Sequence, residues 1–225
     1  MKTRKRPNVV IFFTDQQRWD SSGLHGNPLN LMPTFDRFAR AHTHVAQSFT
    51  CQPVCGPARA CLQTGQYATT NGAVDNNYPL PKDRPTLATC FNDAGYRTAY
   101  FGKWHLAAGP IGPVEPEDRG GYRDWLASNI LEFTSTPYQT TLYNNESELV
   151  ELFGYRPDVM TDAAIRYIVE HRKERPDQPF MASPVDQTVS RPHPGRAAGA
   201  VRPRVGGEDR HQRPVAAIGQ ARFEL

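Results

Sequence analysis

The sequence contains no long hydrophobic run. No stretch within its 225 residues approaches the roughly 18–20 consecutive apolar residues that span a membrane. A basic start, residues 1–7, is followed by an apolar run at residues 9–13 and then by polar residues, with no small-residue cleavage site. These absences predict a cytoplasmic protein without a signal peptide and without a membrane partner.

The chain also lacks an excess of one charge over most of its length. Its net charge is +3, and residues 182–225 account for that value with seven Arg and four acidic residues. Residues 1–181 carry 19 basic and 19 acidic groups and are neutral. Nucleic-acid-binding domains usually carry a basic face or stripe. The neutral body therefore predicts no nucleic-acid partner.

Cysteine is scarce, and its distribution is uneven. Three of the four cysteines fall within eleven positions, namely Cys51, Cys55 and Cys61, whereas Cys90 stands alone. A zinc site usually needs a second closely spaced Cys or His pair, which this chain lacks. A reducing cytoplasm disfavours a disulfide. The crowding by itself therefore favours neither a zinc site nor a disulfide.

Strand-like and helix-like patterns alternate along the chain. Residues 9–13 form a short β-branched and aromatic run, typical of a strand that is buried on both faces of a parallel sheet. Polar residues 14–17 follow at its carboxyl end, where open α/β sheets place ligand sites. A helix is predicted to begin at Pro33, with one face formed by Phe35, Phe38, Ala39 and His42. Two more helices are predicted from Pro85 to Gly95 and over residues 158–172. Strands are predicted over residues 97–101 and from residue 180. Such alternation predicts an α/β fold.

The composition changes at about residue 182. Beyond it Arg, Ala, Gly and Pro dominate, Lys is absent and Phe223 is the only aromatic residue. No helical or strand period is visible there, which predicts a disordered tail over residues 182–225 and a folded domain over residues 1–181. Out-of-frame translation of a GC-rich gene would produce such a change, and a genuine short variant is the alternative.

A short motif places one cysteine at the start of a predicted helix. Cys55 precedes Gly56-Pro57, and proline prefers the first turn of a helix. Backbone N–H groups and the helix dipole make such a start favourable for anions. Arg59 lies one turn later on the same side and can reach back toward Cys55. The arrangement suits an anionic substrate or an oxygen nucleophile.

The same stretch resembles the signature of the sulfatase family, Cys55-x-Pro57-x-Arg59 followed by Ala60, Leu62 and Thr64-Gly65. The resemblance implies that a formylglycine-generating enzyme oxidises Cys55 to Cα-formylglycine. One hydroxyl of the hydrated aldehyde would attack the sulfur of a sulfate ester, and loss of the proton of the second would expel sulfate. Cys51 begins the same pattern but lacks the arginine four residues later, so Cys55 is the predicted nucleophile.

Two further segments resemble the family. Asp15, after the first predicted strand, would bind a divalent cation, normally calcium with manganese as the alternative. Gln16 stands where many relatives have a second Asp and would offer an amide oxygen, and the formylglycine made from Cys55 would offer another. In the Gly-Lys-Trp-His segment, Lys103 would stabilise charge on the sulfate, and His105 would donate a proton to the leaving group or orient it.

Each of these residues alone has an ordinary structural explanation. An Asp at a strand end is more often a turn or cap residue, and a lone Cys is more often a small buried hydrophobe. Lys103 and His105 could equally be solvated or packed in the core. The functional interpretation depends on the occurrence of all three motifs in the order and spacing of the family.

The resemblance covers residues 7–181 and implies the alkaline-phosphatase-like α/β sandwich with a mostly parallel central sheet. The family completes its metal site with a later Asp-Asn or Asp-His pair, and no apolar strand with such a pair follows residue 105. We therefore expect an incomplete, N-terminal part of a catalytic domain, with weak metal binding and little turnover. The predicted function is hydrolysis of a small sulfate ester. The alternatives are hydrolysis of phosphonate monoesters or phosphodiesters, and a catalytically silent fragment.

Overall fold

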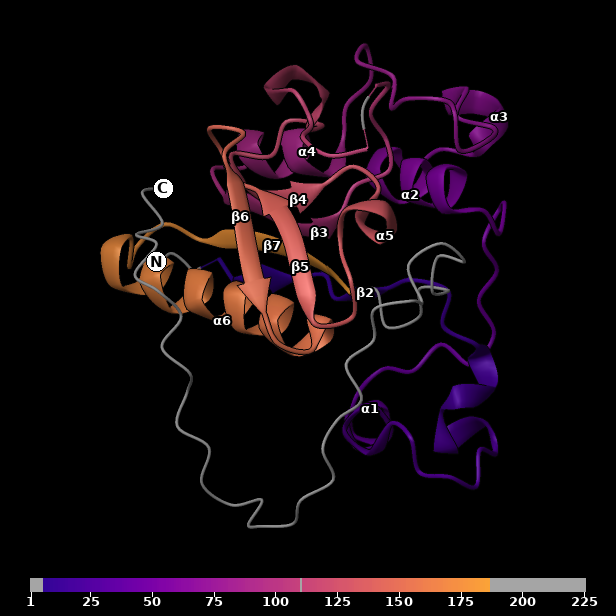
Figure 1. Ribbon diagram of the computed structural model, residues 1–225. Coiled ribbons are helices and arrows are strands. Elements are labelled where there is room, and N and C mark those ends of the chain that lie inside the picture. Colours follow the sequence, from indigo (N-terminus) through magenta and orange to yellow (C-terminus); the bar gives the residue numbers. More distant parts are fainter. Residues whose placement is uncertain (1–5, 110, 187–225) are drawn as a thin grey trace, which may run out of the picture. The chain divides into compact units, whose positions relative to one another are not determined.

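The computed structural model describes residues 6–109 and 111–186, and its central element is a seven-stranded mixed sheet (Figure 1). The strands are β1 (Val9–Val10), β2 (Phe13–Thr14), β3 (Arg97–Lys103), β4 (Asp124–Ser128), β5 (Gln139–Tyr143), β6 (Leu149–Phe153) and β7 (Phe180–Asp186). They lie in the order β1-β7-β3-β4-β5-β6, and β2 pairs with β7 as β1 does. The β4–β5 and β5–β6 pairs are antiparallel, and all other pairs are parallel.

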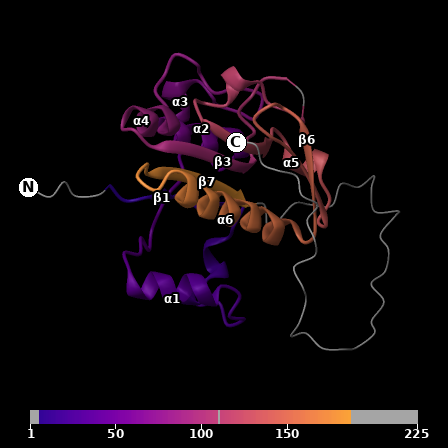
Figure 2. The same ribbon diagram turned by 90° about the vertical axis from the view of Figure 1, so that its left-hand side faces the viewer.

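Helices cover both faces of the sheet. They are α1 (Pro33–Ala41), α2 (Cys55–Thr64), α3 (Ala68–Asn71), α4 (Leu87–Asp93), α5 (Leu131–Thr134) and α6 (Arg156–Glu174), with 3-10 turns η1 (Trp19–Ser21), η2 (Gly23–His25) and η3 (Pro116–Asp118). Helices α2 and α4 lie on one face and α6 lies on the other (Figure 2). This arrangement confirms the predicted α/β sandwich with a mostly parallel sheet.

An aromatic cluster fills the core between the sheet and the α2–α4 layer. Tyr100 of β3 packs against Trp104 and Trp125 with ring centroids 4.9 and 5.3 Å apart, and the two tryptophan rings lie 5.3 Å from each other. All three side chains are buried. Offset and edge-to-face contacts of this kind are worth about 0.5–1.5 kcal/mol per pair beyond the area that they bury. The cluster holds β3 and β4 together beneath the site described below.

Gly102 allows β3 and β7 to approach closely just before the strand ends. Its φ is +100°, and a Cβ at this position would lie 2.2 Å from the carbonyl oxygen of Val185 and 2.6 Å from Cε of Met160. No other residue fits this space, and the positive φ favours glycine independently. The glycine of the Gly-Lys-Trp-His segment therefore serves packing, and it fixes where the next residue, Lys103, leaves the sheet.

The helix predicted over residues 158–172 is confirmed, and α6 is longer by two residues at each end. Its buried side chains include Met160, Ala164, Tyr167 and His171. Each is three or four residues from the next, so one face of the helix packs on the sheet.

The start of α4 is determined by a capping box. The Thr86 hydroxyl oxygen accepts a hydrogen bond from the N–H of Thr89 at 3.1 Å, and the Thr89 hydroxyl oxygen accepts one from the N–H of Thr86 at 2.8 Å. The helix predicted from Pro85 therefore begins at Leu87. The strand predicted over 97–101 is also present, and β3 extends it to Lys103.

The prediction that residues 9–13 are buried on both faces was wrong. Val9, Ile11 and Phe13 pack against the core, whereas Val10 and Phe12 are 51% and 55% exposed. Successive strand residues point to opposite faces, and the described residues cover only one of these faces here. The run also divides into two short strands, β1 and β2.

The apolar stripe predicted for the helix at Pro33 was also wrong, although the helix is present as α1. Phe38 is 62% exposed, and the buried residues of α1 are Asp36 and Ala39. The Asp36 carboxylate accepts hydrogen bonds from the Ser22 hydroxyl at 2.6 Å and from the N–H of Gly23 at 3.0 Å. Polar contacts to the preceding 3-10 turn, and not the phenylalanines, therefore hold this helix.

The sequence boundary proposed between residues 181 and 182 falls inside β7. This strand continues to Asp186 and pairs on both of its sides, with β3 and with β1 and β2. The tail that the composition singles out lies, from residue 187 onward, outside the described residues.

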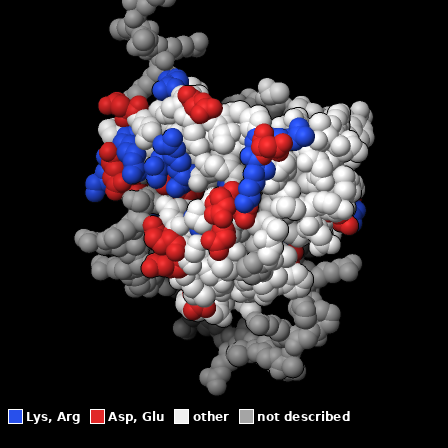
Figure 3. Space-filling view, turned by 90° about the horizontal axis from the view of Figure 1, so that it is seen from above, with Lys and Arg blue, Asp and Glu red and all other residues white. Residues whose placement is uncertain are grey.

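Among the helices that are described, none has the length and apolarity to cross a membrane. Acidic and basic side chains are interspersed on the face shown in Figure 3.

Candidate active site

The site lies where parallel strands end side by side. Asp15 directly follows β2, and Lys103 is the last residue of β3. Both strands pair with β7 in parallel, so their carboxyl ends meet at one edge of the sheet. Lys103 Nζ lies 3.2 Å from Asp15 Oδ2, although 88 residues separate the two in the chain.

Helix α2 presents Cys55 and Arg59 to the same edge. Cys55 is the first residue of the helix, as predicted, and Arg59 follows one turn later. The Arg59 guanidinium donates from Nη2 to Asp15 Oδ2 at 3.2 Å and from Nη1 to the Lys103 carbonyl oxygen at 2.8 Å. Arg59 therefore fixes the start of α2 to both strand ends at once.

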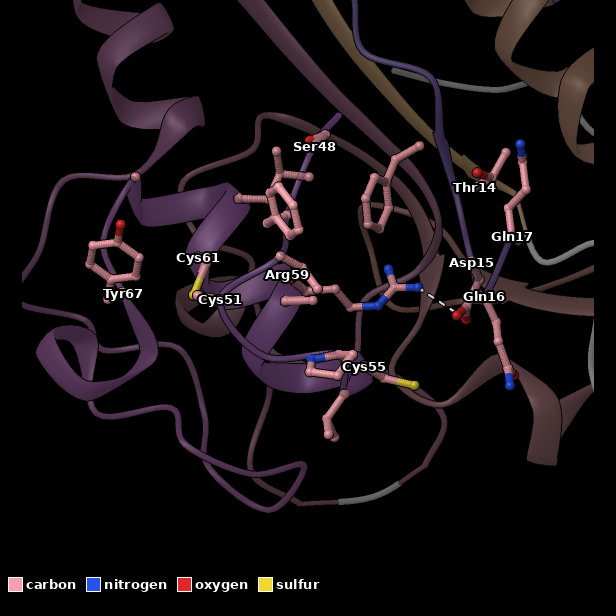
Figure 4. A pocket seen from close by; sticks show the side chains of 18 of the residues that line it. Thr14, Asp15, Gln16, Gln17, Ser48, Cys51, Cys55, Arg59, Cys61 and Tyr67 are labelled. Carbon is pink, nitrogen blue, oxygen red and sulfur yellow. Dashed lines mark hydrogen bonds and ion pairs between the residues drawn. The ribbon is translucent and has the colours of Figure 1, made fainter. Parts of the chain in front are cut away.

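A pocket of about 1130 Å³ opens between these elements. Asp15, Gln16, Cys55 and Arg59 are among its lining residues. In Figure 4 the Cys55 sulfur points to the side of the pocket where Asp15 and Gln16 lie, and a dashed line joins Arg59 to Asp15. Four of the six predicted site residues thus share one cavity.

The charges around Asp15 are largely buried. The side chains of Arg59 and Lys103 are 4% and 1% exposed, and that of Asp15 is 12% exposed. Both cations contact the same carboxylate oxygen, so the carboxylate is held between two positive groups. Buried ion pairs of this kind contribute through geometry, since desolvation offsets much of their attraction. The two cations and the carboxylate thus form one connected set of ion pairs beside the pocket.

The end of β3 is fixed by a buried tyrosine. Tyr100 donates its hydroxyl hydrogen to the Lys103 carbonyl oxygen at 2.6 Å, so this oxygen accepts from both Tyr100 and Arg59. Burial raises the pKa of Tyr100 to about 12, and the hydroxyl stays protonated as this bond requires. The backbone of Lys103 is therefore determined from two sides.

His105 is neutral and held in a turn. Its φ is +56°, and its N–H donates to the Asn129 carbonyl oxygen at 2.7 Å. Burial, and then the positive charge of Lys103, lowers the pKa of His105 to about 4. Within the described residues its buried Nδ1 has no hydrogen-bond partner. A neutral imidazole offers one N–H donor and one lone pair near the site.

Glu132 belongs to this charge cluster, and the sequence did not single it out. It lies in the short helix α5, and its Oε1 is 2.7 Å from Lys103 Nζ. Lys103 thus contacts two carboxylates, those of Asp15 and Glu132. The segment follows β4 at the same edge of the sheet, and β4 was not predicted. Recognition of that strand would have pointed to Glu132, because ligand sites follow the carboxyl ends of parallel strands.

The oxygens near the pocket fit a hard divalent cation in type but form only part of a ligand set. Asp15 offers a carboxylate and Gln16 an amide, and both line the pocket that Cys55 enters. Across residues 6–109 and 111–186 no group of three or more His, Cys, Asp or Glu side chains is arranged to hold a metal. Calcium takes about six to eight oxygen ligands, so these two residues would supply a minority.

These features define an α/β protein with a pocket at the carboxyl edge of its sheet, bordered by paired charges and by a cysteine at a helix start. The Sulfatase family model matches residues 7–185, and the chain belongs to the sulfatase family. The match starts at the residue at which the sequence resemblance begins and ends within β7.

Similar proteins agree with this membership. An ulvan-active sulfatase from Formosa agariphila is 33% identical over 191 residues, which are 84% of this chain and 36% of the relative. An N-acetylglucosamine-6-O-sulfatase from Bacteroides thetaiotaomicron is 30% identical over 172 residues, 76% of this chain and 29% of the relative. The chain therefore spans about a third of the length of the curated relatives that it matches.

Solved structures share the fold. The protein BT4656, solved in complex with its substrate D-glucosamine-2-N,6-O-disulfate, superposes with a TM-score of 0.71 at 27% identity, covering 83% of this chain and 35% of that protein. A structure from Bacteroides fragilis superposes with a TM-score of 0.73 at 23% identity, covering 87% and 46%. At 23% identity, the second comparison shows a shared fold alone.

Proposed function

We propose that this chain carries the nucleophile and the sulfate-binding cations of an enzyme that hydrolyses sulfate esters. The observation that carries the proposal is the grouping of Cys55, Arg59 and Asp15 around one pocket, with Lys103 paired to the same carboxylate. Membership of the sulfatase family supports the reaction class. The chain spans about a third of the length of these relatives, so the activity of a complete site is proposed here as well.

The two cations would bind the ester and stabilise its reaction. A sulfate monoester is an anion; Arg59 lines the pocket, and Lys103 pairs with the Asp15 carboxylate beside it. In the proposed reaction a nucleophile at position 55 attacks sulfur while the bond from sulfur to the alcohol oxygen breaks. Preorganised cations stabilise the negative charge that moves onto this oxygen, since they need not reorient during the step. Formylglycine at position 55 would supply the hydroxyl nucleophile as its hydrate.

His105 would serve the leaving alcohol. Because burial lowers its pKa to about 4, the ring is neutral at pH 7 and retains one N–H. Such a ring can donate a hydrogen bond to the departing oxygen, whereas the lowered pKa leaves little imidazolium to transfer a proton at pH 7. Its position two residues after Lys103 keeps the donor and the cation on one segment.

A divalent cation, with calcium preferred, would bind to Asp15 and Gln16. Both side chains offer the hard oxygens that calcium takes. When bound, the cation would offset negative charge on the sulfate group. Asp15 pairs with Arg59 and Lys103, so the cation would have to share the carboxylate with them or displace one of them.

The substrate class is proposed to be a sulfated saccharide. The two relatives described above are an ulvan-active sulfatase and an N-acetylglucosamine-6-O-sulfatase, and BT4656 is described with a sulfated glucosamine as its substrate. These names support a sugar sulfate over the phosphonate and phosphodiester alternatives.

Mass spectrometry at position 55 tests the nucleophile. The full chain is produced together with a formylglycine-generating enzyme, and the tryptic peptide of residues 41–59 is analysed. We expect the aldehyde at Cys55 and an unmodified thiol at Cys51 of the same peptide. The matched controls are Arg59→Lys, in which modification should fall, and Ala58→Ser, in which it should persist. An unmodified Cys55 under conditions that convert a known sulfatase would refute the proposed nucleophile.

Calcium-dependent stability tests the metal ligands. Thermal unfolding is followed with calcium or with magnesium, because a ligand that binds the folded state raises Tm. We expect a rise with calcium that Asp15→Asn removes. Asp118→Asn, in the 3-10 turn η3, is the matched control and should leave the calcium response unchanged. Equal responses in Asp15→Asn and the unsubstituted chain would contradict the assignment of Asp15.

A further inference from the structure

Two cysteines of the pocket lie against each other. Cys51, in the segment before α2, and Cys61, in the second turn of that helix, have their sulfur atoms 2.8 Å apart. Cys51 is exposed, and Cys61 is partly exposed. Figure 4 shows both at the side of the pocket where Tyr67 lies, whereas the Cys55 sulfur points the other way. The pair is therefore separate from the proposed nucleophile, although all three residues line one cavity.

The separation between the sulfurs distinguishes a disulfide from a metal site. Two thiolates on one tetrahedral zinc, with Zn–S bonds of about 2.3 Å, would lie about 3.8 Å apart. The sulfurs of Cys51 and Cys61 are a full ångström closer than that. Bonded sulfurs lie about 2.05 Å apart, so a shift of under about one ångström joins them. No third soft ligand accompanies the pair within the part of the chain that the structure describes.

We propose that Cys51 and Cys61 form a reversible disulfide that closes an eleven-residue ring containing Cys55 and Arg59. The bond would tie the segment before α2 to the body of the helix and so limit the movement of the helix start. It would also occupy Cys51, the thiol that is four residues from Cys55, and leave Cys55 unpaired for its own modification. Neither consequence depends on the proposed hydrolase activity.

The two thiols differ in a way that sets the order of reaction. A hydrogen bond from Cys61 lowers the pKa of Cys51, and burial raises the pKa of Cys61 to about 11. The exposed Cys51 thiolate therefore attacks first. The oxidant is a low-molecular-weight disulfide such as oxidised glutathione.

The exchange proceeds through a mixed disulfide. Cys51 attacks one glutathione sulfur, the S–S bond of the oxidant breaks, and the first glutathione leaves as a thiolate. Cys61 then gives its proton to this thiolate and attacks the Cys51 sulfur, and the second glutathione leaves and takes a proton from water. Overall, two protein thiols are oxidised to one disulfide, and one glutathione disulfide is reduced to two glutathione thiols.

Peptide mapping under non-reducing conditions tests the proposal. The purified full chain is equilibrated with graded ratios of oxidised to reduced glutathione, quenched by alkylation and digested with trypsin, which cuts after Arg59 and so separates Cys51 from Cys61. We expect a linked pair of peptides, residues 41–59 with residues 60–82, that disappears on reduction. Cys90, which is exposed and stands alone, should be alkylated or carry glutathione but should appear in no linked pair of peptides at any ratio.

Variants assign the linked sulfurs. Cys51→Ser and Cys61→Ser should each abolish the link, whereas Cys55→Ala and Cys90→Ser should retain it. Oxidation should also raise the Tm of the unsubstituted chain by several degrees and leave that of Cys51→Ser unchanged. A link between Cys51 and Cys55, a link that survives Cys61→Ser, or complete alkylation of Cys51 and Cys61 at the most oxidising ratio would overturn the proposal. Because the alkylation measurement uses the unsubstituted chain, its outcome does not depend on whether any variant folds.

Discussion

A carboxylate paired with a cation lies near each end of β3, and the two are held in different ways. Asp124, the first residue of β4, lies beside Arg97 at the amino end of β3. Asp15 lies beside Lys103 at the carboxyl end. Both carboxylates are paired with cations within the same sheet, so their surroundings, and not their chemistry, account for the difference.

The carboxylate at the amino end is enclosed. Asp124 has a side chain that is 1% exposed, and Arg97 contacts both of its oxygens, with Nε 2.8 Å from Oδ2 and Nη2 hydrogen-bonded to Oδ1. The Tyr167 hydroxyl donates to Oδ2 at 3.0 Å. Burial raises the pKa of Tyr167, so this donor keeps its proton. The bidentate geometry and the third donor are typical of a structural clamp.

The carboxylate at the opposite end borders a pocket. Asp15 contacts two cations through one oxygen, and one of these, Lys103, is shared with Glu132. Several partners around one group allow an exchange of contacts when a ligand enters, whereas the enclosed pair of Asp124 allows none. The pocket thus lies at the end of the sheet where the ion pairs are shared.

The largest expected effect is that of Asp124→Asn. Removal of this charge leaves Arg97 without its carboxylate in a largely buried site, and breaking such a pair costs about 3–5 kcal/mol. The free energy of unfolding, measured by urea denaturation with a common m-value, should fall by about this amount. A loss of unfolding free energy below about 1 kcal/mol would contradict the distinction drawn between the two ends of β3.

Asp15→Asn should cost less, about 1–2 kcal/mol, when no divalent cation is added. Lys103 keeps Glu132 as a partner, and the position borders solvent in the pocket, so less unpaired charge is buried. The same urea measurement compares the two variants directly. If Asp15→Asn is more destabilising than Asp124→Asn, the ion pairs at the carboxyl end of β3 contribute more to stability than those at its amino end, and the comparison made here is wrong.

The pH dependence of stability should report on His105. Its pKa is about 4 in the folded chain and near 6.5 when unfolded, so the unfolded state binds the proton more readily. The corresponding stability is fully present above pH 6.5 and is lost as the pH falls through 4. In His105→Gln, the fall in the free energy of unfolding between pH 6.5 and 4 should be smaller. The control is His42→Gln, an exposed site, which should keep the slope of the unsubstituted chain.

The smallest expected effect on stability is that of Glu132→Gln, below about 1 kcal/mol, because the side chain is 24% exposed and Lys103 retains Asp15. The same variant should tighten binding of free sulfate, measured by calorimetry, since one negative charge next to Lys103 is removed. Unchanged sulfate affinity would show that Glu132 does not compete for this cation.

Much of the site was predictable because its parts are local. Cys55 and Arg59 lie one helical turn apart, and Lys103 and His105 are separated by one residue, so their spacing is visible in the sequence. The α6 stripe was predictable for the same reason, since helical period and burial coincide there. The exposure of Val10 and Phe12 could not be predicted, because a short apolar run does not reveal whether one or both faces of the strand are covered.

The sequence by itself determined which side chains are candidates for the site and the helix or strand end on which each lies. Only the tertiary structure decided the partners. Arg59 and Lys103 meet at Asp15 across 44 and 88 residues, Glu132 joins them from a helix that no pattern predicted, and Cys51 faces Cys61. The physical reason is that helix and strand patterns encode neighbours within a few residues, whereas contacts between distant segments depend on how the strands are ordered in the sheet.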